Sequence, residues 1–356
     1  MGNFNFVGKV VMPNDVEKFY NKATSKKDGK DYWAWNRVSF MLKGGDSSAF
    51  VELGGGHFAD TSKAKIYSYG LENNKLEISW ADRNKEEILG LVADFKKIKV
   101  NFDSEQEFIS EFDAVEYLES VIPMIEKDKL IYVSGNIKYE PYNGKFTPKF
   151  TISRIGYAKE DAIPKFEINM EVFYSKDSYD DSRLEEEKVI ELMGYVEQYI
   201  NKEEGKKYIP QKLTFNCRKI DFNNEAHVKQ FDYFKRFMQT KSKNYVKMAY
   251  KINYVRGAEE VEFTEDMLTN TQKEQIIMGM ATFEDFKPRV NFGGNSIVEF
   301  RIVKPNLASK GYENGVIDTE IKIDEFESNI YKIVPKFENL TESKVEKTDE
   351  IEDLFK

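Results

Sequence analysis

Two indole rings and a guanidinium share one side of a predicted strand over residues 32–40, YWAWNRVSF. Successive side chains of a strand point to opposite faces, so Trp33, Trp35 and Arg37 lie opposite the apolar Ala34 and Val38. A nucleic-acid base stacked on an aromatic ring gains roughly 1–3 kcal/mol, and a neighbouring arginine assists it. These residues therefore predict a non-covalent platform for flat ligands. The alternative is that the following segment folds over them and makes both tryptophans part of a second small core.

A predicted hairpin over residues 129–139 and 145–155 interleaves lysine with tyrosine on its polar side. Its other side carries Val133 and Ile137, which suit a core. Lysines spaced along a strand can follow a phosphate backbone, while tyrosine offers a base another ring. The alternative is an ordinary solvated strand face. The candidate binding residues of this hairpin are Lys138, Tyr142, Lys145 and Lys149.

The second half of the chain repeats this arrangement without tryptophan. Basic side chains alternate with Leu213 and Phe215 in one predicted strand and with Met248 and Tyr250 in another. They either extend the same track or serve only solubility. The candidates in this half are Lys212, Arg218, Lys247 and Lys251.

The distribution of charge matters because the 356 residues carry a formal net charge of −9, which opposes binding of a polyanion. Residues 229–251 hold seven cations against one acid, whereas acids gather at residues 180–187 and at the C-terminus. This pattern predicts that the charge is segregated, as a binding groove requires.

Catalytic chemistry finds little support in the sequence. The two histidines and the single cysteine, Cys217, do not have the spacing of a zinc site, and no nuclease-like set of residues is present. The segment GGGH at residues 54–57 lacks the features of a phosphate-binding loop and predicts a flexible turn. We expect no enzymatic activity, no catalytic residue, no metal and no cofactor.

The elements that position these residues form two series. Alternating residues predict a strand over 3–11, a hairpin over 32–42 and 48–53, a helix over 108–125 and the hairpin over 129–155, with an insertion at about 57–107. A weaker version of this order recurs, which we interpret as an internal duplication. It has strands over 189–200 and 208–220, a helix over 225–239, a hairpin over 245–255 and 259–264, a helical stretch from 264 to 283, and strands over 297–304 and 316–323.

These elements resemble those of bacterial and phage single-stranded DNA-binding proteins. The resemblance is carried by LIYVSGNI at residues 130–137 followed by YNGK at 142–145, by FVGKV at 6–10 and by WNRVSF at 35–40. It covers about residues 3–56 and 108–158. The chain differs in being about twice as long as usual for that family, in its insertion, and in lacking a Gly- and Gln-rich linker, so its oligomeric state stays open.

Together with the internal duplication, the resemblance implies a β-dominated α+β fold of two tandem OB-like β-barrels. The first spans residues 1–160 with the insertion, the second spans residues 161–337, and a disordered acidic tail spans residues 338–356. It also implies sequence-independent binding of single-stranded DNA in replication and recombination, by a protein of the cytoplasm, or of the host cytoplasm if a phage encodes it.

The tail ends in EIEDLFK, which resembles the family's acidic tip that docks into replication or recombination proteins. Here a lysine, Lys356, follows the phenylalanine. The alternative is a tail that serves only solubility. The candidate partner-binding residues are Asp349, Glu350, Ile351, Glu352, Asp353, Leu354 and Phe355.

Rival functions remain open at this point. One is a phage structural or protein-docking module that binds no nucleic acid, another is a strand-annealing recombination mediator, and a third is an enzyme that needs a metal. The lone cysteine fits a reducing compartment, and no apolar run approaches the ~20 residues that span a bilayer.

Overall fold

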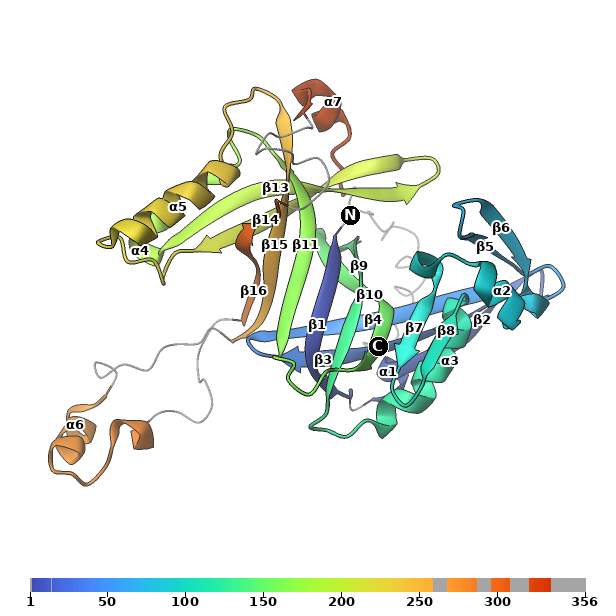
Figure 1. Ribbon diagram of the computed structural model, residues 1–356, viewed down its shortest axis with the longest axis horizontal. Coiled ribbons are helices and arrows are strands. Elements are labelled where there is room, and N and C mark those ends of the chain that lie inside the picture. Colours follow the sequence, from blue (N-terminus) through green and yellow to red (C-terminus); the bar gives the residue numbers. More distant parts are fainter. Residues whose placement is uncertain (1, 14, 259–267, 287–295, 308–319, 334–356) are drawn as a thin grey trace, which may run out of the picture.

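The computed structural model describes residues 2–13, 15–258, 268–286, 296–307 and 320–333. It is an α+β fold dominated by strands, with one mixed sheet of 15 strands and a separate hairpin of β5 (Lys65–Tyr69) and β6 (Lys75–Ser79) (Figure 1). Within the described residues, no helix is long and apolar enough to cross a membrane.

Five strands of the first half pair in a ring. In ring order they are β1 (Asn3–Val11), β3 (Lys30–Gly44), β4 (Ser47–Phe58), β10 (Lys145–Tyr157) and β9 (Leu130–Tyr142), which pairs again with β1. Among the pairings of this ring, only that between β4 and β10 is parallel. The alternating residues point their apolar members inward, so that Phe6, Phe40 and Val51 are fully buried.

Five strands of the second half follow the same order. They are β11 (Lys165–Tyr174), β13 (Val189–Asn201), β14 (Gly205–Asn216), β16 (Ser296–Pro305) and β15 (Tyr245–Ala258), which pairs with β11. This ring is only partly closed, because β11 meets β13, and β14 meets β16, through one pair of residues each. The pairing of β14 with β16 is parallel, as in the first ring.

In each ring one helix leads into the last strand named above, α3 into β9 and α5 into β15. Helix α3 (Glu111–Val121) begins at Ser110, whose hydroxyl oxygen accepts a hydrogen bond from the backbone N–H of Asp113. Helix α5 (Glu225–Met238) begins at Asn224, whose side-chain oxygen accepts from the N–H of Ala226. These side chains satisfy backbone donors that have no partner inside the helix. Both helices are confirmed where the sequence predicted them.

The two rings share one hydrophobic core. Strand β1 pairs antiparallel with β11, and the Ser48 hydroxyl of β4 donates to the Arg256 carbonyl of β15 at 3.1 Å. Inside, the Phe150 ring lies 4.8 Å from the Phe166 ring and 5.1 Å from the Tyr254 ring, centroid to centroid. These contacts across the two halves fix the rings against each other.

The inserted segment extends the sheet of the first ring. Strand β7 (Ile98–Asn101) runs parallel to β10, and β8 (Glu105–Phe108) pairs with β7. The hairpin β5–β6 and helix α2 (Glu86–Leu91) lie beside α3 at the edge of the molecule (Figure 1). The other short elements are α1 (Val16–Phe19), β12 (Tyr179–Asp180), α4 (Leu184–Glu187), α6 (Asn270–Ile277), β17 (Glu320–Ile321) and α7 (Ile323–Ser328).

The structure adds one strand to the predicted first hairpin and corrects one predicted turn. The polar residues after β1 form a strand, β2 (Tyr20–Lys27), which pairs with β3 through a turn at Asp28 and Gly29. Both turn residues have positive φ, the signature of a tight hairpin turn. The glycines at residues 54–56 do not form a flexible turn either, because β4 continues through them to Phe58.

Gly55 is required where it stands because α3 begins directly against it. A Cβ atom at this position would lie 2.4 Å from the Phe112 nitrogen and 2.7 Å from the Glu111 carbonyl carbon. At Gly54 the nearest atoms would be at 3.4 Å or more, which is ordinary contact.

We therefore expect Gly55→Ala to lower the free energy of unfolding by roughly 1–3 kcal/mol through forced backbone movement, and Gly54→Ala by less than about 0.5 kcal/mol. Urea denaturation of the two variants beside the wild type measures the difference. Equal losses would show that α3 does not press on β4 at this point.

Several predicted elements have parts outside the described residues. The predicted strand over 259–264 lies there, and so do residues 316–319 of the last predicted strand, of which only β17 is observed as a strand. The predicted helix over 264–283 is confirmed only for α6. The tail over 338–356 also lies outside the described residues.

Candidate nucleic-acid interface

A cleft of about 1050 Å³ lies between the two rings. From the first ring, β3, β4 and β10 line it, and from the second ring β13, β14, β15 and β16. The second and third strands of both rings, β3 with β4 and β13 with β14, therefore share one cavity.

The lining of the cleft is basic although the chain as a whole is acidic. Six cationic side chains face three carboxylates, an excess opposite in sign to the formal net charge of −9. The cations are Arg37, Lys145, Lys149, Arg183, Lys212 and Arg256, and the acids are Glu52, Glu191 and Glu299. A polyanion entering the cleft meets this local excess first.

On the wall of the first ring, Glu52 lies between two cations. Its carboxylate is 4.0 Å from Arg37 Nη1 and 3.5 Å from Lys149 Nζ. Lys149 also donates to Glu140 at 2.6 Å. Burial acts to lower the pKa of Lys149, but the contacts with Glu140 and Glu52 outweigh it and raise that pKa, so the ammonium stays charged at neutral pH.

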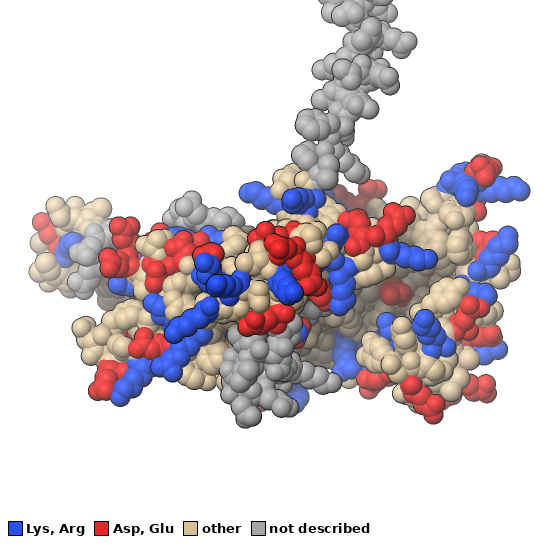
Figure 2. Space-filling view, turned by 90° about the horizontal axis from the view of Figure 1, so that it is seen from above, with Lys and Arg blue, Asp and Glu red and all other residues tan. Residues whose placement is uncertain are grey.

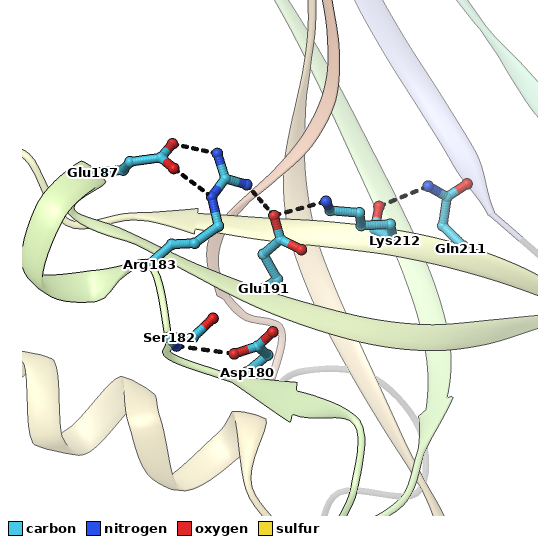
Figure 3. Close-up of polar contacts among 7 residues, drawn as sticks. All are labelled: Asp180, Ser182, Arg183, Glu187, Glu191, Gln211 and Lys212. Atoms are coloured by element: carbon cyan, nitrogen blue, oxygen red, sulfur yellow. Dashed lines mark hydrogen bonds and ion pairs between the residues drawn. The ribbon is translucent and has the colours of Figure 1, made fainter.

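On the wall of the second ring, Glu191 likewise lies between two cations (Figure 3). It accepts hydrogen bonds from Arg183 and from Lys212, the latter at 2.7 Å. Arg183 also donates hydrogen bonds from Nε and Nη2 to the Glu187 carboxylate, and these bonds lower the pKa of the Glu187 carboxyl. The same contacts raise the pKa of Arg183.

An exposed aromatic ring lines the cleft. Phe50 is 45% exposed, and the Arg256 guanidinium carbon is 5.9 Å from its ring centroid. Neither residue was predicted as part of a site. The alternation of side chains along β4 could have revealed Phe50, because it shares the polar face of this strand with Ser48 and Glu52.

The two tryptophans extend this surface out of the cleft along β3. In the antiparallel pair, Trp35 is opposite Gly56 and Arg37 is opposite Gly54, and opposite residues point to the same face. The glycines add no side chains beside the half-buried Trp35 and Arg37. Trp33 contacts Phe58 edge to face at 5.2 Å.

The inserted segment does not cover the tryptophan face. It packs on the other side of β3, where Trp80 and Ala64 form a small cluster with Phe112 and Ala34. A second small core thus exists, but its tryptophan is Trp80, and Trp33 and Trp35 remain half-buried outside it.

The structure brings four of the predicted binding residues into the cleft, namely Arg37, Lys145, Lys149 and Lys212. Two more lie beside them: Lys138 is opposite Lys149 in the β9–β10 register, and Tyr142 is opposite Lys145. Tyr142 is 68% exposed at the end of this hairpin.

The remaining predicted residues of the second half lie elsewhere. Arg218 Nε donates to the Glu187 carbonyl at 3.4 Å, Lys247 pairs with Glu171 at 3.5 Å, and Lys251 is opposite Asn169 on β11. Only Lys212 of this group lines the cleft, because β15 turns Tyr254 and Arg256 toward it instead. The predicted tail residues, Asp349 to Phe355, lie outside the described residues.

The predicted segregation of charge is not seen on the face in Figure 2, where basic and acidic side chains are interspersed. None of the cleft lining comes from residues 229–251. Within that segment, Lys229 pairs with Glu225 at 2.6 Å and Lys235 with Asp181 at 3.3 Å. The local excess of cations is assembled from both halves of the chain instead.

Among the described residues, no group of three or more His, Cys, Asp or Glu side chains is placed to hold a metal ion. Cys217 is fully buried in the second ring, and this burial raises the pKa of its thiol to about 11. A thiol so protonated is a poor nucleophile.

Comparison of the sequence with protein-family models and with curated proteins gave no match. Among solved structures, the chain is similar to a deletion mutant of the single-stranded DNA binding protein from Thermus aquaticus. The similarity covers 72% of this chain and 87% of that chain at 9% sequence identity, with a TM-score of 0.27.

Proposed function

We propose that the protein binds single-stranded DNA without sequence preference, in the cleft between its two rings and along the tryptophan face of β3. The observation that carries the proposal is the cleft itself, in which six cations and the exposed ring of Phe50 come together. Single strands are bound by this combination of a basic groove for the backbone and aromatic rings for the bases.

The strand order supports an OB-like barrel for each ring. An OB-fold is a five-stranded, partly open barrel, and its second and third strands form the usual face for oligonucleotides. Here those strands are β3 with β4 and β13 with β14, and both pairs line the cleft. We propose two tandem OB-like domains, over residues 1–160 and 161–337, followed by an acidic tail over 338–356 that recruits replication or recombination proteins.

The tryptophan face of β3 is long enough to bind several nucleotides. Same-face residues on a strand are spaced by about 7 Å, so the face from Trp33 to Met41 is about 27 Å long. A strand that lies along it can stack on the tryptophans and on Phe50, while Arg37 and the cleft lysines contact phosphates. The protein would act by covering the single strand, without making or breaking a covalent bond. The covered strand would be protected from pairing and cleavage.

The test is a fluorescence anisotropy titration with labelled oligo-dT of about 30 nucleotides, which two OB-like units can cover, beside a matched duplex and an RNA. The variant Lys145→Ala/Lys149→Ala/Lys212→Ala removes three cleft cations. We expect at least tenfold weaker binding at about 50 mM salt, and a salt dependence of log K that is shallower by about 2, since each phosphate contact on a single strand contributes about 0.7.

The matched control, Lys75→Ala/Lys127→Ala/Lys229→Ala, removes the same charge from exposed lysines that do not line the cleft. It should bind within about twofold of the wild type. Equal losses in both variants would contradict the cleft as the site. Absence of binding to all three nucleic acids would favour a protein-docking module, and faster pairing of complementary strands would favour an annealing mediator.

A further inference from the structure

On each wall of the cleft a carboxylate lies between two cations and pairs with both. Glu52 does this for Arg37 and Lys149 in the first ring, and Glu191 does it for Arg183 and Lys212 in the second. The two acidic side chains are only 24% and 18% exposed, whereas the four cations are 35–49% exposed. Each carboxylate thus lies deeper in the wall than the cations around it.

An arginine and a lysine that converge on one carboxylate form a site that also suits a phosphodiester. Both anions carry one negative charge, and one oxygen of either can accept from a guanidinium N–H and an ammonium together, as one oxygen of Glu191 does from Arg183 and Lys212. A carboxylate and a phosphate therefore compete for the same donors.

We propose that Glu191 occupies a phosphate-binding site in the free protein, and that a phosphate of the bound strand displaces it from Arg183 and Lys212. This inference rests on the proposed function and deepens it, because it names the group that the strand must replace. Glu52 takes the same role for Arg37 and Lys149 in the first ring.

The neighbouring contacts allow this exchange without loss of order. Arg183 keeps its two-nitrogen contact with Glu187 when Glu191 moves away, so the guanidinium stays in place (Figure 3). Glu187 does not line the cleft, whereas Glu191, Arg183 and Lys212 do. The Lys212 carbonyl accepts a hydrogen bond from Gln211 at 2.8 Å, which involves the backbone and does not hold the ammonium.

The DNA strand must therefore break these internal ion pairs before its phosphates can pair with the same cations. The internal carboxylates lower the affinity for phosphate and keep the free cleft from attracting unrelated anions. They also return to the cations when the strand leaves, which favours exchange of the protein between strands.

The experiment measures binding of labelled oligo-dT to the full chain as wild type, Glu191→Gln and Glu187→Gln. Glutamine keeps the size of the side chain and removes the charge. We expect Glu191→Gln to bind about 3- to 10-fold more tightly at about 50 mM salt, with a steeper salt dependence, because the freed cations gain a phosphate contact. Glu187→Gln removes the same charge next to the same arginine and should change affinity by less than about twofold.

Two outcomes would overturn the inference while the proposed function stands. Equal tightening in both variants would show a general effect of net charge, and weaker binding by Glu191→Gln would show that Glu191 positions the two cations for DNA. Glu52→Gln supplies a second test in the other ring, and its gain should add to that of Glu191→Gln because the sites share no residue. Failure of the wild type itself to bind oligo-dT would instead overturn the proposed function.

Discussion

Replacement of both Trp33 and Trp35 by alanine is expected to weaken binding of oligo-dT by at least about 30-fold. Each base stacked on an aromatic ring contributes roughly 1–3 kcal/mol, so the loss of two platforms costs roughly 2–6 kcal/mol of binding free energy. Both indoles lie on the same face as Arg37. Trp35 and Arg37 are opposite Gly56 and Gly54, which leave the face open beside them, and Trp33 is opposite Phe58. Anisotropy titration at one fixed salt concentration measures the change.

The tryptophan prediction has two controls. Trp33→Phe/Trp35→Phe keeps two rings and should retain most of the affinity while it abolishes the quenching of tryptophan fluorescence by DNA, since only the buried Trp80 remains. Tyr67→Ala removes a ring that is 75% exposed on β5 and does not line the cleft, and it should leave binding unchanged. Unchanged affinity of the double alanine variant, with an unchanged melting temperature, would contradict stacking on this face.

The sequence predicted the face of each strand better than the surface on which the strands meet. Alternation alone placed Trp33, Trp35 and Arg37 together, because one face of β3 is buried and a shift of one residue would expose the core. The same reasoning placed Lys212 opposite Leu213 and Phe215, which are buried as expected.

What the sequence did not predict depends on contacts between distant segments. The cleft exists because β1 pairs with β11 and because β4 meets β15, and neither contact leaves a local pattern. Arg183 and Arg256 were therefore missed, since one lies just before a short helix and the other at the end of a strand.

Strand β2 was missed for a different reason. Most of its residues are exposed on both faces, so it has no apolar alternation, and its pairing with β3 stabilises it. The Asp28-Gly29 turn was the signal that could have revealed it. The glycines at 54–56 led to a predicted turn where the structure has a strand. Gly55 allows α3 to pack closely against β4 and does not end the strand.

Helix α7 gives the second large effect, on stability. Its Phe326 is fully buried and stacks between the rings of Tyr208 and Tyr245, each with its centroid 3.9 Å away. Phe173 of β11 packs against the same ring at 5.6 Å. Burial is the main cause that raises the pKa of Tyr245 to about 12, as expected inside such a cluster. Strands β11, β14 and β15 thus meet on one side chain that comes from outside their ring.

We therefore expect Phe326→Ala to lower the free energy of unfolding by roughly 3–5 kcal/mol, the cost of a large cavity in a packed aromatic cluster. Ile323→Ala, on the same helix at a residue that is 37% exposed, should cost less than about 1 kcal/mol. Urea denaturation followed by circular dichroism measures both variants.

Because β11 and β13 meet through a single residue pair, the loss of Phe326 should also loosen the wall that holds Glu191 and Lys212. Binding of oligo-dT by the folded Phe326→Ala variant should then weaken, although Phe326 lies outside the cleft. A variant that is as stable as the wild type would show that α7 only rests on the second ring. A variant that is destabilised but binds as before would show that the cleft does not depend on closure of that ring.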